Sequence, residues 1–303
     1  MRYGILVAAC TIASLSLDAQ QPDAQPPVVF RSAVDLVTIQ ASVRDARGHV
    51  LSGLSVNDFE VRDNGRVRPI LSLRSDRQSP LSLAVLVDTS GSMRVGAKVA
   101  MAREALTALT SQLRDGQDEV ALFSFDSSLH ERRGFTKDLS TLKDALSGPE
   151  PFGSTSLYDA TAATARQLAT RDGARKAIIV LTDGVDTSSV LSAAEVSGLA
   201  SSIAVPVFVV ATVPAIDERL MLDMTPRSGA ADLRDLAAWT GGQLVFASSF
   251  TESASVASSL VNELREQYVL VIEAAANAEW RRLDVRVPRR SAIVKARSGY
   301  FGG

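Results

Sequence analysis

Long apolar runs alternate with amphipathic stretches through the middle of the chain. Residues 81–88 and 176–182 are apolar runs with almost no charge, as is typical of strands buried on both faces of a parallel sheet. After each run the apolar residues recur at helical spacing. Repeated strand–helix units of this kind predict an α/β fold, a doubly wound and mostly parallel sheet with helices on both faces. The other predicted strands cover 119–125, 129–135 as a hairpin, 205–211 and 243–247, and the predicted helices cover 95–113, 139–146, 156–170, 193–202, 231–240 and 252–267.

Both ends of the chain show the period-two alternation of strands instead. Apolar and polar residues alternate from 37 to 44, and Asn64-Gly65 predicts a tight hairpin because such turns need positive φ. In the tail we expect strands over 268–273, 282–287 and 291–300. We further expect these tail strands to pair with the N-terminal segment, so that both ends of the chain build one small β module.

These patterns divide the chain into five parts. We predict a signal peptide over 1–20, a Pro-rich linker over 21–27 and an N-terminal β module over 28–78. The α/β domain follows over 81–267, and a β tail occupies 268–303.

The N-terminus predicts export. Arg2 precedes a mostly apolar stretch over 5–17, which is too short to span a membrane and ends in small and polar residues. No other stretch is long and apolar enough to be a transmembrane segment. Lipid anchoring at Cys10 is not expected, because cleavage before it would leave the apolar stretch 12–17 unexplained.

The composition of the chain limits which ligands and metals it can bind. The net charge of −2 gives no support for nucleic-acid binding. With 2 His and 1 Cys, the chain lacks the ligands of an ordinary zinc site. Any metal would therefore be bound by oxygen atoms, which favours Mg²⁺, Mn²⁺ or Ca²⁺.

Oxygen-bearing side chains stand at the ends of predicted strands or the starts of helices. Each group has an ordinary alternative explanation, since Ser and Thr cap helices and Asp-Gly forms turns. Together, however, they supply three hydroxyls and two carboxylates to one edge of a doubly wound sheet, where ligands bind. Such a set suits a hard divalent cation with one coordination position left open for an external carboxylate. The candidate ligands are Asp88, Ser90, Ser92, Thr155 and Asp183.

The order Asp-x-Ser-x-Ser, then Thr, then Asp resembles the metal-ion-dependent adhesion site of von Willebrand factor type A domains. The resemblance covers 81–267 and implies a metal-dependent module that binds a protein partner through an acidic group, and not an enzyme. The flanking stretches 34–65 and 297–301 are similar to secreted von Willebrand A-related proteins of acidobacteria-like genomes.

Other functions fit less well. A hydrolase would need a base beside its nucleophile, but His49 and His130 lie in the β module and at a predicted hairpin tip. The chain has neither a Gly-x-Ser-x-Gly elbow nor a phosphate-binding Gly-Lys loop. The alternative that stays open is an envelope scaffold or assembly protein whose metal site is structural or vestigial.

Several other residues have ordinary expected roles. Asp126 and Asp186 are expected to be turn or cap residues near the same edge, and Trp239 and Trp280 packing residues. The basic residues of the tail are expected on solvated strand faces. They are Arg281, Arg282, Arg286, Arg289, Arg290, Lys295 and Arg297.

Overall fold

The computed structural model describes residues 35–302 except 76, 143–144, 146–149, 173–174, 185, 203, 213–228 and 289–291. The predicted signal peptide, the linker and Cys10 lie outside the described residues, as do residues 28–34 of the predicted β module.

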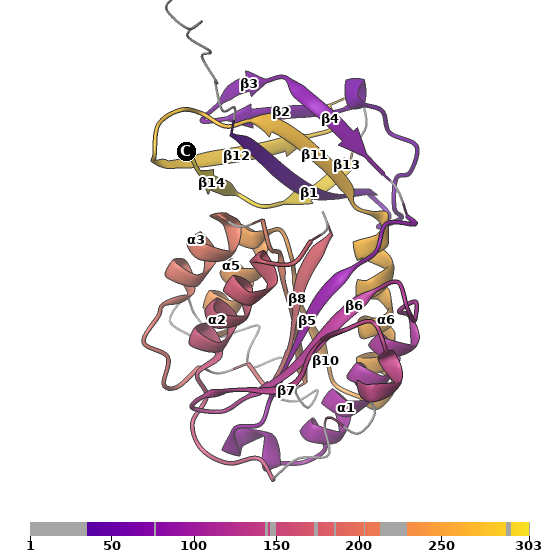
Figure 1. Ribbon diagram of the computed structural model, residues 1–303, viewed down its shortest axis with the longest axis vertical. Helices are drawn as coiled ribbons and strands as arrows, with labels where there is room; N and C mark the ends of the chain where they lie inside the picture. The colour runs from indigo at the N-terminus through magenta and orange to yellow at the C-terminus, as the bar shows by residue number, and fades with distance from the viewer. Residues whose placement is uncertain are drawn as a thin grey trace, which may run out of the picture. The chain divides into compact units, whose positions relative to one another are not determined.

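A six-stranded sheet forms the centre of the α/β domain (Figure 1). All seven residues of β5 (Ser82–Asp88) are buried, because helices cover the sheet on both sides. Its neighbours β6 and β8 pair with it in parallel, and only β7 runs antiparallel, as the hairpin partner of β6. In spatial order the strands are β10 (Leu244–Ala247), β9 (Val207–Thr212), β8 (Lys176–Thr182), β5, β6 (Glu119–Phe125) and β7 (Leu129–Thr136).

The helices lie in two layers, which confirms the predicted doubly wound fold. The alternation within β5 divides the core, since Val85 packs with one layer and Leu86 with the other. One layer holds α1 (Lys98–Ser111) and α6 (Phe250–Glu266), and the other holds α2 (Leu157–Ala169), α3 (Ala193–Ser202) and α5 (Gly229–Thr240).

Two predicted helices differ from the structure. The helix expected over 95–113 begins only at Lys98, because Gly96 has a φ of 67°. A separate 3₁₀ turn, Gly91–Arg94, lies before the predicted start. The helix expected over 139–146 is a 3₁₀ turn, Leu139–Leu142, within the described part of that stretch.

Strands from both chain ends form a β-sandwich, as the alternation predicts. In the first sheet β1 (Leu36–Asp45) lies between two tail strands. In the second, β12 of the tail pairs with β2 of the N-terminal segment. The sheets have the orders β13 (Ala292–Ala296), β1, β11 (Tyr268–Glu273), β4 (Ile70–Arg74) and β14 (Gly299–Phe301), β12 (Trp280–Arg286), β2 (Glu60–Asp63), β3 (Arg66–Arg68).

The single strand expected over 291–300 is wrong, because β13 and β14 belong to different sheets. The break coincides with an attachment to the α/β domain. The backbone N–H of Ser298 donates to the carbonyl of Trp239 at 2.9 Å, and the Arg297 guanidinium donates to the carbonyls of Ser201 and Thr38. Arg297 is only 5% exposed, so the expectation that the tail's basic residues are solvated is wrong for it.

The polar positions of β1 are also used between the sandwich and the α/β domain. Gln40 is 7% exposed, and its side-chain amide donates to the carbonyls of Lys176 and Ala204 at 3.3 and 3.1 Å. The amide of Gln267 donates to the Ser42 hydroxyl at 3.4 Å. The polar half of the alternation therefore holds two parts of the fold together.

Candidate metal centre

Three loops meet at the edge of the sheet where its parallel strands end. Asp88 is the last residue of β5, and Asp183 directly follows the neighbouring strand β8, so the two carboxylates stand at adjacent strand ends. The first loop follows β5, the second precedes α2 and the third follows β8. The backbone N–H of Gly91 in the first loop donates to the carbonyl of Gly153 in the second at 2.9 Å, which brings these two loops together. This edge is where open α/β sheets bind ligands.

Asp88 is buried, with 1% of its surface exposed. Its Oδ1 accepts a hydrogen bond of 2.8 Å from the backbone N–H of Ser90, and its Oδ2 accepts one of 2.6 Å from the hydroxyl of Thr182. Burial raises the pKa of Asp88 to about 6, while the hydrogen bonds from Thr182 and Ser90 oppose the rise and the nearby Asp183 adds to it. The carboxylate is thus fixed in place but carries a charge that burial makes costly.

The serine hydroxyls of the first loop do not cap the 3₁₀ turn that follows. Ser90 stands at the cap position with no side-chain capping bond, and its Oγ lies 3.1 Å from that of Ser92. Ser90 is fully buried, whereas Ser92 is exposed. The capping explanation therefore fails for Ser90, which contacts Asp88 and carries the Ser92 hydroxyl next to its own.

Thr155 is bound to the loop that follows β8. Its backbone N–H donates to the Thr187 hydroxyl at 2.9 Å, and its carbonyl accepts from the backbone N–H groups of Thr187 and Ser188. Its side chain caps no helix, since the cap position of α2 is Ser156. Thr155 is 3% exposed, so the residue is buried where the second and third loops meet.

Asp183 has one oxygen paired and one unpaired. Its Oδ2 accepts a hydrogen bond of 2.9 Å from Nζ of Lys98, which also donates to the carbonyl of Ser92 at 3.4 Å. Its Oδ1 is buried and has no hydrogen-bond partner among the described residues. A buried carboxylate oxygen without a donor favours a cation beside it, whereas the ammonium on the other oxygen already neutralises part of the charge.

The donor set fits a hard divalent cation. Within the described part of the chain, no three His, Cys, Asp or Glu side chains come together, so a metal here would depend on hydroxyl oxygens as well as two carboxylates. Mg²⁺, Mn²⁺ and Ca²⁺ accept such ligands. Asp88, Ser90, Ser92 and Asp183 are linked by the contacts above, and Thr155 joins them through backbone contacts of its loop.

Sequence reasoning missed Thr182 and Lys98. Thr182 ends a predicted apolar strand, where a buried polar residue needs a partner. Lys98 is the first residue of α1, where a positive charge opposes the helix dipole. Each residue departs from the pattern of its element in the sequence, but neither departure indicates which distant residue is its partner.

The other acidic residues of this edge serve the local backbone, in agreement with the expected turn and cap roles. Asp186 accepts hydrogen bonds from the backbone N–H groups of Tyr158 and Ser189, at 3.2 and 3.0 Å. Asp126 accepts one from the backbone N–H of Ser128 at 2.9 Å. His130 is exposed beside Asp126, at 3.4 Å.

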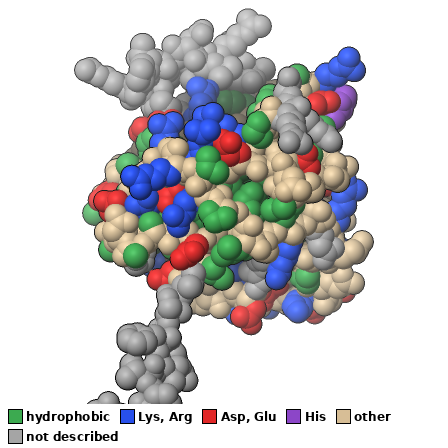
Figure 2. All heavy atoms as spheres, turned by 90° about the horizontal axis from the view of Figure 1, so that it is seen from above, with side chains coloured by type: hydrophobic (Ala, Val, Ile, Leu, Met, Phe, Trp, Pro, Cys, Tyr) green, Lys and Arg blue, Asp and Glu red, His purple; other side chains and the backbone are tan. Residues whose placement is uncertain are grey.

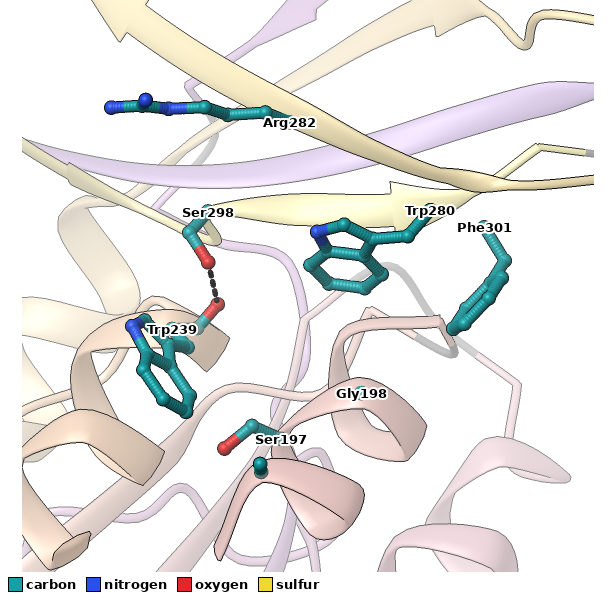
Figure 3. A pocket seen from close by; sticks show the side chains of 8 residues that line it. Ser197, Gly198, Trp239, Trp280, Arg282, Ser298 and Phe301 are labelled. Carbon is teal, nitrogen blue, oxygen red and sulfur yellow. Dashed lines mark hydrogen bonds between the residues drawn. The ribbon is translucent and has the colours of Figure 1, made fainter. Parts of the chain in front are cut away.

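Away from the candidate metal centre, a hollow lies between the sandwich and the helices α3 and α5 (Figure 3). Its volume is about 700 Å³, and both tryptophans of the chain line it. Trp239 and Trp280 are 38% and 40% exposed, so packing accounts for only part of their surface. The ring of Phe301 meets Trp280 edge-on at 5.3 Å.

The face of the molecule seen in Figure 2 carries basic and acidic side chains interspersed, with scattered apolar ones. Nucleic-acid binding usually uses a continuous basic patch, whereas on this face acidic side chains lie among the basic ones. Among the helices that the structure describes, none is long and apolar enough to cross a membrane.

Comparison with known proteins finds one family model that matches the central part of the chain. Residues 83–185 match the family described as the von Willebrand factor type A domain. A von Willebrand factor type A structure from Catenulispora acidiphila is 14% identical, with a TM-score of 0.51 over 84% of this chain and 71% of that one. Proximal thread matrix protein 1 from the mussel byssus, "with zinc occupied MIDAS motif", is 15% identical, with a TM-score of 0.53.

The match to the mussel protein covers 65% of this chain and 48% of that one. No curated protein matches this sequence. At these identities the structural matches establish the fold alone, and the α/β domain has the von Willebrand A fold that the sequence pattern resembles.

Proposed function

We propose that the three loops bind a divalent cation through Asp88, Ser90, Ser92, Thr155 and Asp183, and that the cation binds an acidic group of a protein partner. The observation that carries this proposal is the pair of carboxylates at one sheet edge. Asp88 and Asp183 are 1% and 4% exposed, and Oδ1 of Asp183 is buried without a partner. Two buried carboxylates stabilise the fold poorly unless a cation accompanies them.

The expected cation is Mg²⁺, with Mn²⁺ or Ca²⁺ as substitutes. The mussel protein's zinc-occupied motif supports metal binding by this fold. Here the ligands are all oxygen atoms, which favour harder ions than zinc. Since three of the five are neutral hydroxyls, the bound ion would keep much of its charge and attract an external carboxylate.

We also infer the setting in which the site works. The N-terminal sequence supports export, and the flanking stretches support a place among secreted von Willebrand A-related proteins of the acidobacterial type. The positions of His49 and His130, which the sequence pattern does not place beside a nucleophile, support a binding module and not an enzyme. The ligand we expect is a protein that offers an Asp or Glu side chain or a chain terminus.

A scaffold with a vestigial site is the second candidate. One observation favours it, namely that Lys98 already supplies a positive charge to Asp183 at 2.9 Å. If that ion pair is permanent, the fold needs no metal.

Thermal unfolding distinguishes the metal-dependent binding module from the scaffold with a vestigial site. The melting temperature of the purified protein should rise when Mg²⁺ or Mn²⁺ replaces EDTA, because a ligand of the native state alone stabilises it by mass action. Asp88→Ala should abolish the rise. Asp126→Ala is the matched control and should keep it, because Asp126 is a half-buried carboxylate near the same edge that is not a candidate ligand. Acetate, as the simplest carboxylate probe, should add a further rise only when metal is present. No rise with either metal would leave the scaffold as the function.

A further inference from the structure

Lys98 occupies a position that a metal site would not ordinarily include. Its Nζ lies 2.9 Å from Oδ2 of Asp183 and 3.4 Å from the carbonyl oxygen of Ser92, and 15% of its side chain is exposed. Both acceptors belong to the candidate metal ligands or to their backbone. The ammonium group is therefore a cation already bound at the edge of the site.

The position of Lys98 in its helix is unfavourable apart from this contact. Lys98 is the first residue of α1, and the first turn of that helix contains no acidic residue. A positive charge at a helix N-terminus opposes the helix dipole, so the contact with Asp183 is what offsets it. Helix formation alone gives no reason for a lysine here.

We infer that Lys98 is a built-in competitor of the divalent cation, which neutralises Asp183 in the metal-free protein and leaves it when metal binds. This inference rests on the proposed metal site. A divalent ion on Asp183 would repel an ammonium held on the same carboxylate, so both cannot be bound there at full strength. Lysine can leave, because its charge sits on a flexible four-carbon stem that already reaches solvent.

The exchange has two consequences for the site. In the absence of metal, Lys98 keeps Asp183 paired, and the loops stay folded with one carboxylate neutralised. In the presence of metal, the ammonium moves to the exposed side, where Ser92 lies. Lys98 thereby sets the metal concentration at which the site is filled and couples filling to a new positive charge at its rim.

The test is to titrate the full chain with MnCl₂ in a calorimeter and to measure the affinity for Mn²⁺. Lys98→Met keeps the length of the side chain and removes its charge, and we expect Mn²⁺ to bind about tenfold more tightly, within the usual range of coupling between two ligands. Lys98→Arg keeps the charge and should keep the weaker affinity. In EDTA, Lys98→Met should melt at a lower temperature than the wild type, because Asp183 loses its partner.

Arg94→Met is the matched control. Arg94 lies in the same segment, is 57% exposed and pairs with Glu150 at 3.9 Å, without contact to Asp183. Removing its charge tests how far the net charge near the site alters Mn²⁺ affinity, and we expect a much smaller change than for Lys98→Met. Equal tightening in both Met variants would overturn the inference, because the effect would then come from net charge and not from competition for Asp183.

The remaining outcomes separate this inference from the proposed function. If the wild type binds Mn²⁺ and Lys98→Met binds it no more tightly, the inference is overturned and the metal site stands. If only Lys98→Met binds, the competition is established and the wild type is a scaffold with a blocked site. If neither binds, the metal site is overturned and the inference with it.

Discussion

The hydroxyl of Thr182 donates a hydrogen bond of 2.6 Å to Oδ2 of Asp88. The two residues end the adjacent strands β8 and β5, so this bond joins the two strand ends at the candidate metal centre. The Thr182 oxygen also accepts from the backbone N–H of Gly184 at 3.1 Å, which directs its own proton toward Asp88. Thr182 thus orients a carboxylate that would bind the metal.

Replacing Thr182 by Val should weaken metal binding without unfolding the protein. Val keeps the shape but removes the donor, and loss of a group that orients a metal ligand costs about 10–100-fold in affinity. Titration with Mn²⁺ measures the change. Thr212→Val is the control, since Thr212 ends the next strand and bonds to the carbonyl of Thr182 rather than to Asp88. Unchanged affinity in Thr182→Val would contradict the orienting role.

Asp88 should make the metal-free protein less stable as pH rises. Its pKa is about 6 in the folded protein and near 3.8 in the unfolded chain, so the native state holds the proton more tightly. The free energy of unfolding should therefore fall between pH 4 and 6 and stay lower above 6, by about 3 kcal/mol.

Asp88→Asn removes this titration. In EDTA at pH 7–8 the variant should unfold at a higher denaturant concentration than the wild type, and the difference should vanish below pH 4. With metal the order should reverse, because only the ionised wild-type carboxylate binds the cation, and affinity should rise through pH 6. A pH-independent difference between the two proteins would contradict this account.

Asp118 should be among the most sensitive positions for stability. It is fully buried, and it accepts hydrogen bonds from the backbone N–H groups of Leu81 and Arg114 and from the Arg265 guanidinium. Burial acts to raise the pKa of Asp118, but the hydrogen bonds from Arg265, Leu81 and Arg114 outweigh it and lower the pKa below 3.8. The residue thus joins the start of β5, the segment after α1 and the helix α6, at the edge opposite the metal centre.

Asp118→Asn should cost about 2–4 kcal/mol, because Arg265 would lose its carboxylate partner in a buried place. The stability that Asp118 contributes is present above pH 3.8 and lost as pH falls through its lowered pKa. Urea unfolding at pH 7 and pH 3 should show the difference shrinking in acid. The exposed Asp115→Asn is the control and should change stability little.

Gly242 should tolerate no side chain. A Cβ there would lie 2.0 Å from the carbonyl oxygen of Val207, on the strand beside the α5–β10 connection. Gly242→Ala should therefore destabilise the protein by about 3 kcal/mol or more, measured by urea unfolding. Gly198→Ala is the matched control, because a Cβ at that α3 position meets nothing within 4 Å and alanine favours helix. Equal stability of the two variants would contradict the close packing at Gly242.

The sequence by itself determined the class of fold and the strands of the central sheet. Predicted and observed bounds agree for 119–125, 176–182 and 193–202. Central strands are buried along their length and a packed helix along one face, and each shows this in its apolar pattern. The Asn64-Gly65 turn was equally local, with both residues at positive φ. The candidate ligands could be named because each follows or precedes such an element.

Only the tertiary structure decided which polar groups meet. Nothing near Lys98 in the chain points to Asp183, 85 residues away, and nothing near Gln40 points to the carbonyl of Lys176. In the same way, the attachment of Ser298 to Trp239 coincides with the break between β13 and β14. The physical reason is that burial leaves a periodic trace along the chain, whereas a hydrogen bond or ion pair between distant segments depends on where the packed layers place its two ends.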